Sequence, residues 1–315
     1  MRLMRRPSHD RDKLPGNCVA TVGTFDGLHL GHQRILSRVL ATARARNLPS
    51  VVLSFEPTPR EYFSAGVPPA RLTRFREKFA ALRNLGLDWL FCPPFDAVMQ
   101  SLGPEEFIQQ LLVDTLGVQH LVVGDDFVFA KQRRGNVNHL RREGKRHGFS
   151  VERVGSVLED GHRVSSTEIR RLLAGGDMSG AKHLLGRHYA MTGRVVDGQK
   201  LGKKLGYPTA NVNLNRRASP VAGIFAVRVG GLASKNDHDG LLDGVASVGI
   251  RPTIEGVVPL LEVHIFDFDR DIYGEYIEVE FVAKLRDEVK FPDLESLTEQ
   301  MHIDAAQARE ILEAA

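Results

Sequence analysis

The sequence predicts two domains, an α/β domain built on a parallel sheet and then a small closed β-barrel with a C-terminal helix. The chain has 315 residues, which is more than one hydrophobic core usually supports. In the first half, strand-like stretches alternate with helix-like stretches, an order typical of a parallel sheet with helices on both faces. In the second half, short alternating strands dominate up to a final helical stretch. We therefore expect domains over residues 1–185 and 186–315.

Apolar periodicity places the elements of the first domain. Leu72, Phe75, Phe79 and Leu82 recur at helical spacing, and Gly86 ends that helix. The other expected elements are strands over 18–23, 51–55, 89–92 and 121–124, and helices over 33–46 and around 107–116. Ligands of such sheets gather at the carboxyl ends of the strands, where the motif-bearing loops follow.

The second domain shows the two-residue period of half-buried strands. Ile277, Val279 and Phe281 alternate with two glutamates, and residues 225–229, 241–248 and 260–268 look similar. Short strands at this spacing suggest a closed β-barrel. Residues 292–315 predict a last helix, whose inward-facing side chains are expected to be Leu294, Leu297, Met301 and Ile311.

The bulk composition excludes several classes of protein. The net charge is only +3, without the basic stripe of a dedicated DNA- or RNA-binding protein. Cys18 and Cys92 belong to no CxxC pair, so we expect two buried thiols rather than a disulfide or zinc site. The basic N-terminus lacks an apolar stretch typical of a secretory signal, and no apolar run reaches membrane-spanning length. We expect a cytoplasmic protein.

A glycine-rich segment, GTFDGLHLGHQ over residues 23–33, follows the first expected strand. Glycine lets backbone N–H groups approach a phosphate, and a helix start adds partial positive charge. His29 and His32 lie three residues apart at the predicted helix start, so both can face one phosphate and stabilise charge at an α-phosphorus during nucleotidyl transfer. The pair could instead bind zinc, or one ring could pack while the other is exposed, but zinc needs more ligands than the neighbouring sequence supplies.

The segment SSTEIR over residues 165–170 offers further phosphate donors. Ser165 and Glu168 have the spacing of a capping box, which is the structural explanation of the segment. The two explanations are compatible, because a capped helix start still presents free N–H groups to a phosphate. Ser166, Thr167 and Arg170 can bind further phosphate oxygens.

A second glycine-rich segment, GQKLGKKLGYPTAN, covers residues 198–211. It is not a Walker A motif, because it is one residue short and no Ser or Thr follows Lys203. An exposed turn would explain its glycines and lysines equally well. Thr209 and Asn211, however, add a hydroxyl and a carboxamide oxygen, which are hard donors suited to Mg²⁺ beside a phosphate. Two such segments in one chain suggest two nucleotide sites and two uses of ATP.

Glu262 lies in an alternating strand, on the side away from Val263. Its carboxylate points either to solvent, which is the usual case, or into a pocket. In a pocket it could act as a general base that takes the proton from a substrate hydroxyl.

The first-domain motifs resemble the signatures of the nucleotidyltransferase superfamily. GTFDGLHLGHQ, together with FEPTP over 55–59 and VGDDFVFA over 123–130, is similar to its FMN adenylyltransferase branch. The resemblance implies a Rossmann-like domain, with His29, His32 and Arg170 as catalytic residues and a flavin near Asp125, Asp126 and Phe127. It implies ATP-binding positions at Gly23, Thr24, Phe25, Asp26, Gly31, Ser165, Ser166 and Thr167. Val128 and Ala130 stand where the family commonly has a basic residue and a glycine, which affects the local flavin contacts.

The second-domain motifs resemble riboflavin kinase. GQKLGKKLGYPTAN, SVGIRPTIEG over 247–256, Glu262 with DIYGE, and KLRDEVKF over 284–291 cover nearly the whole second half in order. The resemblance implies a six-stranded barrel, Glu262 as the base for the ribityl 5′-hydroxyl, and Arg286 near the flavin. It implies an ATP site with Gly198, Lys203, Gly206, Thr209 and Asn211, the last two as magnesium ligands.

In this order, the halves resemble the bacterial bifunctional riboflavin kinase/FMN adenylyltransferase family. The resemblance implies Mg²⁺, the substrates ATP, riboflavin and FMN, the product FAD, no nucleic-acid or membrane partner, and a monomer or transient homo-oligomer. One rival is an adenylyl- or cytidylyltransferase for another acceptor, with a barrel that only binds ligand. Another is a flavin-sensing or RNA-binding module without turnover, against which the intact motif residues argue.

Overall fold

The computed structural model describes residues 1–5, 16–198, 202, 205–232, 240–253 and 256–315, and these form two compact units. The first unit contains residues 1–69 and 73–165, and the second contains residues 70–72 and 166–315. The helices α7 (Ser166–Ala174) and α8 (Met178–Leu185) thus belong to the second unit. The domain boundary expected after residue 185 stays a prediction.

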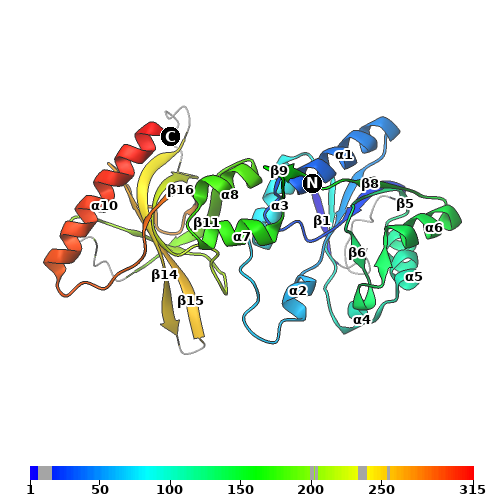
Figure 1. Ribbon diagram of the computed structural model, residues 1–315, viewed down its shortest axis with the longest axis horizontal. Coiled ribbons are helices and arrows are strands. Elements are labelled where there is room, and N and C mark those ends of the chain that lie inside the picture. The colour runs from blue at the N-terminus through cyan, green and yellow to red at the C-terminus, as the bar shows by residue number, and fades with distance from the viewer. Residues whose placement is uncertain (6–15, 199–201, 203–204, 233–239, 254–255) are drawn as a thin grey trace. The chain divides into compact units, whose positions relative to one another are not determined.

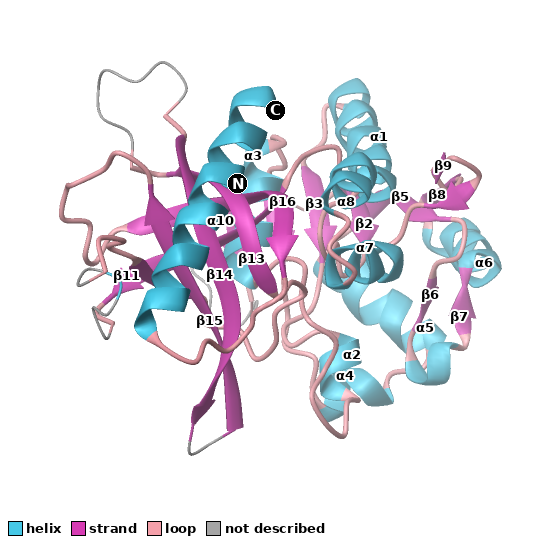
Figure 2. Ribbon diagram, turned by 60° about the vertical axis from the view of Figure 1, so that its left-hand side comes forward, coloured by secondary structure: helices cyan, strands magenta, loops and turns pink. Residues whose placement is uncertain are grey.

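The first unit is built on a six-stranded parallel sheet (Figure 2). In chain order its strands are β1 Arg2–Met4, β2 Cys18–Val22, β3 Ser50–Leu53, β4 Trp89–Phe91, β5 Val118–Gly124 and β8 Ser150–Val154. Their order across the sheet is β1-β4-β3-β2-β5-β8. From β2 the chain moves outward through β3 and β4, and then returns to the other side of β2 as β5. This reversal makes the carboxyl ends of β2 and β5 the expected ligand position.

Helices cover both faces of the sheet. The helices of this unit are α1 Leu30–Arg46, α2 Pro59–Tyr62, α3 Phe75–Asn84, α4 Ala97–Ser101, α5 Pro104–Phe107, the π-helix η1 Ile108–Thr115 and α6 Val137–His147, of which α1, α3, α5, η1 and α6 pack on the sheet. Alternate strand residues enter two apolar clusters, so that Val19 packs with α1 and α3, whereas Ala20 packs with α5, η1 and α6. The two cysteines are free and buried, as predicted.

The first unit also contains several short strands and a 3₁₀ helix outside the main sheet. They are β6 Val128–Phe129, the 3₁₀ helix η2 Lys131–Arg133, β7 Gly135–Asn136, β9 Leu158–Glu159 and β10 His162–Arg163. β6 pairs with β7 and β9 pairs with β10, both in antiparallel fashion.

The second unit contains the predicted closed barrel, with six antiparallel strands in the order β11-β12-β15-β14-β13-β16. They are β11 Tyr189–Val196, β12 Ala210–Asn213, β13 Gly223–Gly230, β14 Leu242–Thr253, β15 Gly256–Ile265 and β16 Tyr276–Arg286. The alternation predicted for β16 is confirmed, because Ile277, Val279 and Phe281 are buried inside the barrel.

The final helix, α10 (Leu294–Ala314), lies across the outside of the barrel (Figure 1). Its apolar contacts with the strands come from its second half, through Ala305, Ala308, Ile311 and Leu312. The expectation that Leu294 turns inward was wrong, since this side chain is 55% exposed. The apolar cluster between α10 and the barrel does not extend to the first turn of the helix. Leu294 therefore lies outside the part of the helix that packs in this cluster.

Among the residues described, no helix is both long and apolar enough to span a membrane.

Candidate functional site

The loop after β2 has a backbone held in an unusual conformation. Phe25 and Leu28 both adopt the left-handed region, at φ 48° and 45°, and both side chains are buried. Asp26 anchors the loop, because its Oδ1 accepts hydrogen bonds from the Thr73 backbone N–H at 2.8 Å and from the Thr73 hydroxyl at 3.2 Å. Gly27 N–H in turn donates to Thr73 Oγ1 at 3.0 Å. The structure therefore gives Asp26 a role in shaping the loop; its predicted contact with ATP stays a prediction.

The two histidines of this loop lie face to face at the start of α1. His29 is the N-cap, and its Nδ1 accepts the His32 backbone N–H at 3.3 Å. The two rings stack with centroids 3.6 Å apart. A Cβ on Gly31 would lie 3.2 Å from the His29 ring, so a side chain there would press on the pair. The structure thus brings His29, Gly31 and His32 together at the carboxyl end of β2.

The electrostatics of the pair keep His32 neutral. Burial lowers the pKa of His32 well below its usual 6.5, and unfavourable electrostatic interactions of a protonated His32 with His29 and Lys78 lower it further. Within the described part of the chain, His32 Nδ1 is buried without a hydrogen-bond partner. A neutral ring in a positive surrounding suits an anionic ligand.

Lys78 is a charged residue at this site that the sequence did not reveal. It lies on α3, is only 2% exposed, and donates from Nζ to Ser54 Oγ at 3.5 Å. Lysine is almost never buried without a partner. From the sequence pattern alone, Lys78 would therefore be expected to be exposed to solvent. Only the fold shows that Lys78 lies near Ser54, directly after β3, and near His32.

SSTEIR spans the division between the two units. Ser165 ends the first unit, while Ser166, Thr167 and Arg170 lie on α7 in the second. Arg170 is fixed within the second unit, because its Nε donates to the Ala70 carbonyl at 2.6 Å and its Nη1 donates to the Ser166 carbonyl at 3.1 Å. Glu168 forms an ion pair with Arg171 at 2.6 Å. The predicted triphosphate contacts of this segment stay predictions.

Asp125, Asp126 and Phe127 follow β5, beside the loop after β2. Asp125 accepts hydrogen bonds from the Ser156 backbone and hydroxyl at 3.1 and 2.9 Å. Burial acts to raise the pKa of Asp125, but the hydrogen bonds from Ser156 and the charge of Arg163 outweigh burial and lower it. Asp126 pairs with Arg163 at 2.6 Å.

Phe127 stacks on Phe129, with the ring centroids 5.6 Å apart. It is half-buried and packs against the apolar cluster on one face of the sheet. The three side chains therefore lie at the predicted edge of the sheet, and their contacts with a flavin stay predictions.

In the barrel, three polar residues form one row across neighbouring strands. Asn211 on β12 lies opposite Glu262 on β15, and Glu262 lies opposite Ser247 on β14. The intervening residues Val212 and Val263 are buried in the barrel, so the polar row faces outward. Asn211 is nonetheless only 9% exposed, which shows that other residues cover this part of the outer face.

The glycine–lysine segment supplies part of that cover. A Cβ on Gly198 would collide with the carboxamide of Asn211, and a Cβ on Gly202 would collide with the Tyr207 carbonyl. Gly206 adopts φ 86°, a conformation that glycine takes without strain. Lys203 lies outside the described residues. The glycines are therefore explained by close approach to Asn211 and to the turn before Thr209.

Arg286, predicted near the flavin, forms a bidentate ion pair with Asp304 on α10. Its Nε and Nη2 donate to the carboxylate at 2.9 and 2.7 Å, and Gln300 Nε2 adds a bond to Asp304 at 2.9 Å. Asp304 is 3% exposed, so this pair ties α10 to the end of β16. A flavin contact of Arg286 stays a prediction.

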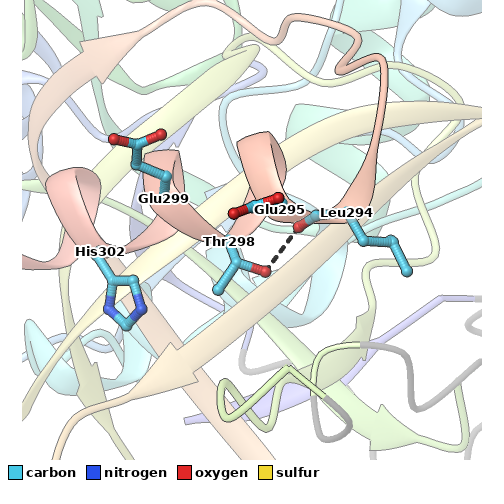
Figure 3. Close-up of a pocket in the computed structure, with 5 residues that line it drawn as sticks. All are labelled: Leu294, Glu295, Thr298, Glu299 and His302. Carbon is cyan, nitrogen blue, oxygen red and sulfur yellow. Dashed lines mark hydrogen bonds between the residues drawn. The ribbon is translucent and has the colours of Figure 1, made fainter.

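Two hollows on the surface are lined by other residues. One is lined by five residues of α10: Leu294, Glu295, Thr298, Glu299 and His302 (Figure 3). There the Thr298 hydroxyl donates to the Leu294 carbonyl at 2.7 Å. The other hollow lies between α1 and β8 and is lined by Arg34, Arg38 and Arg153 among others. Neither is lined by a predicted site residue.

Two family models match the chain, in an order that parallels the two sites. A FAD synthetase model matches residues 11–168, and a riboflavin kinase model matches residues 185–312. The histidine pair falls within the first match, and the Asn211–Glu262 row falls within the second.

Curated relatives extend over nearly the whole chain and carry one name, bifunctional riboflavin kinase/FMN adenylyltransferase. The relative from Haemophilus influenzae is 43% identical and covers 96% of this chain and 97% of its own. That from Escherichia coli is 43% identical and that from Pseudomonas fluorescens 45% identical, each covering 98% of this chain and 97% of its own.

A solved structure from Streptococcus pneumoniae, named a macrolide-efflux protein, matches with a TM-score of 0.81. It is 29% identical and covers 96% of both chains. A structure of similar length therefore shares this fold.

Proposed function

The chain belongs to the bifunctional riboflavin kinase/FMN adenylyltransferase family, and from that premise we propose that it makes FAD in two steps at two separate sites. The barrel phosphorylates riboflavin with ATP to give FMN and ADP. The domain built on the parallel sheet then transfers AMP from a second ATP to FMN, which gives FAD and pyrophosphate.

In the kinase step, Glu262 is the proposed general base. It takes the proton from the ribityl 5′-hydroxyl, whose oxygen attacks the γ-phosphorus of ATP while ADP leaves. Its support is the row described above, in which the strand register fixes the carboxylate opposite Asn211. Gly198, Lys203 and Gly206 belong to the proposed ATP-binding loop.

Magnesium is the proposed metal of this step, held by Thr209 and Asn211. A hydroxyl and a carboxamide oxygen suit Mg²⁺, which prefers oxygen ligands and shares them with substrate phosphates. Neither residue offers the thiolate or imidazole that would point to a transition metal. When bound, the ion neutralises phosphate charge.

In the adenylyl step, the FMN phosphate attacks the α-phosphorus of ATP in line and pyrophosphate leaves. No covalent enzyme intermediate is needed, so positioning and electrostatics supply the acceleration. His29 and His32 contact the ATP phosphates in this proposal, beside Gly23, Thr24, Phe25, Asp26 and Gly31. Ser165, Ser166, Thr167 and Arg170 hold the triphosphate, and Asp125, Asp126 and Phe127 lie near the flavin; Arg286 lies near the flavin of the kinase site.

The single observation that carries the proposal is the presence of both geometries in one chain, the stacked histidines at the end of β2 and the paired Asn211 and Glu262 on the barrel. The direct test incubates the purified protein with riboflavin, ATP and Mg²⁺ and separates the flavins by chromatography. FMN should form first and FAD after it. Recovery of riboflavin alone from folded protein would refute the proposal.

Location, partners, assembly and domain boundary complete the proposal. Both steps consume ATP, so we place the enzyme in the cytoplasm. Its partners are small molecules rather than nucleic acid, and it acts as a monomer or a transient homo-oligomer. The domain boundary after residue 185 is supported by the start of the riboflavin kinase match at that residue.

A further inference from the structure

The turn that precedes Thr209 is tied to β15 by a side chain. The backbone pairing of β12 with β15 runs from Val212–Leu261 to Ala210–Val263 and ends there. One residue further along β15, His264 Nδ1 lies 2.9 Å from the Pro208 carbonyl oxygen. Because a carbonyl oxygen only accepts, this contact requires the hydrogen of His264 to be on Nδ1. The imidazole thus continues the strand pairing beyond its last backbone pair.

The same turn is also held by α10. Tyr207 packs edge-on against His264, with centroids 5.0 Å apart, and against His302 on α10, with centroids 5.2 Å apart. A hydrogen bond also joins the Tyr207 hydroxyl to His302 Nδ1. Two elements, β15 and α10, therefore hold the two residues that come directly before Thr209.

His264 lies two residues after Glu262, on the same outer face of β15. One strand thus carries both the proposed base and the side chain that fixes the turn before the proposed magnesium ligand. A hydrogen bond to the Pro208 carbonyl sets the Pro208–Thr209 peptide plane, and that plane determines where the Thr209 side chain starts.

We infer that His264 is a positioning residue of the kinase site, whose Nδ1–H fixes the Pro208 carbonyl and thereby aims Thr209 toward the metal and nucleotide. Tyr207 and His302 brace the same turn. The inference rests on the proposed role of Thr209. Its alternative is a purely packing role, in which the His264 ring only fills the space between Tyr207 and Phe266, whose centroid lies 5.7 Å away.

Two variants separate the donor from the ring. His264→Phe keeps an aromatic ring between Tyr207 and Phe266 but has no N–H. His264→Asn loses the ring but keeps an N–H near the position of Nδ1. Loss of one neutral hydrogen bond should lower kcat/KM for ATP in riboflavin phosphorylation about tenfold in His264→Phe. His264→Asn should recover most of that loss. An Asn variant as poor as the Phe variant, or a Phe variant within about twofold of wild type, overturns the inference.

Each sample contains its own control. Adenylyl transfer to supplied FMN takes place in the other domain, so it should stay within about twofold of wild type in both variants. The matched control is Asp243→Asn, which removes an ion pair between β14 and Arg228, an arginine that also donates to the Leu312 carbonyl on α10, without touching His264 or Pro208. It should leave kinase activity unchanged. A tenfold loss in this control would show that changes near α10 impair the kinase whether or not they touch Pro208, and would overturn the inference.

Thr209→Val distinguishes failure of this inference from failure of the site assignment. If Thr209→Val phosphorylates riboflavin normally, the proposed magnesium site is wrong, whatever His264 does. If Thr209→Val fails and His264→Phe is normal, only the positioning role is wrong. Nitrogen-15 NMR of the ligand-free protein gives a readout without turnover. It should show His264 as the Nδ1–H tautomer; the Nε2–H tautomer would contradict the hydrogen bond.

Discussion

Asn211 and Glu262 lie directly opposite each other on the antiparallel strands β12 and β15. The barrel therefore sets the separation between a carboxamide and a carboxylate through backbone pairing rather than through a flexible loop. Ser247 continues the row on β14, where its hydroxyl donates to Glu288 at 2.9 Å. A proposed metal ligand and a proposed base held in this way need little reorganisation when substrates bind.

Glu262→Gln should abolish FMN formation from riboflavin while conversion of supplied FMN to FAD continues. The amide keeps the shape of the side chain but cannot accept the proton, so a loss of about 10²–10⁴-fold in kinase kcat is expected. Chromatography of the flavins measures both reactions in one sample. Glu280→Gln, on β16 of the same barrel, is the matched control and should remain active.

His29→Ala should collapse FAD formation and spare riboflavin phosphorylation. Removing one group that stabilises developing charge costs about 10²–10³-fold in rate. The helix also loses its N-cap bond to the His32 backbone, so thermal unfolding should be measured alongside activity. His139→Ala on α6 is the control, and near-wild-type adenylyl transfer by His29→Ala would reject the assignment.

Acid should destabilise the first domain through His32. In the folded state burial, His29 and Lys78 depress the pKa of His32, whereas the unfolded chain titrates near 6.5. Below that pH the unfolded state binds the extra proton, so stability falls as the pH is lowered. The unfolding temperature should drop between about pH 7 and pH 5, and His32→Asn should show a smaller drop. An equal drop in both proteins would contradict this attribution.

Asp304→Ala should loosen α10 from the barrel. It leaves Arg286 without its bidentate partner, and because the arginine is partly exposed we expect a loss of about 2–3 kcal/mol in unfolding free energy. Urea unfolding measures the change. Asp287→Asn removes the exposed pair with Lys284 and should cost less than about 1 kcal/mol. Equal losses in the two variants would show that the Arg286–Asp304 pair contributes no more to stability than the exposed pair.

Gly198→Ala should impair the kinase alone. The added methyl group would collide with the Asn211 carboxamide, so the turn or the proposed metal ligand must move. A fall of about tenfold or more in kinase kcat/KM is expected from a displacement of this kind. Gly175→Ala, where a Cβ makes only ordinary contacts, is the matched control. A Gly198→Ala enzyme with normal kinetics would show that this close approach does not matter.

Periodicity was sufficient for the fold class and for elements such as α3 and β16, because their apolar residues repeat over several turns or strand pairs. It placed β16 and the closed barrel correctly. It missed β1, whose three residues are a strand only through pairing with β4. It also missed α6, where charged residues hide the few buried positions, Val137, Leu140, Glu143 and Gly144.

The sites were less predictable than the fold. The spacing of His29 and His32 correctly implied proximity, yet the N-cap bond starts α1 at Leu30, earlier than the expected residue 33. Lys78 could not be found, because nothing in a helical pattern distinguishes a buried lysine from a solvated one. Leu294 was predicted wrongly, because periodicity indicates which face of a helix is buried but not how many turns of that face contact the barrel.

The most direct test of two independent sites is complementation between Glu262→Gln and His29→Ala, given riboflavin, ATP and Mg²⁺. Alone, the first protein should return riboflavin and the second should stop at FMN. Mixed in equal amounts they should make FAD, because FMN released by one is adenylylated by the other. The contradicting result is that each folded variant alone has lost both activities and that their mixture makes no FAD.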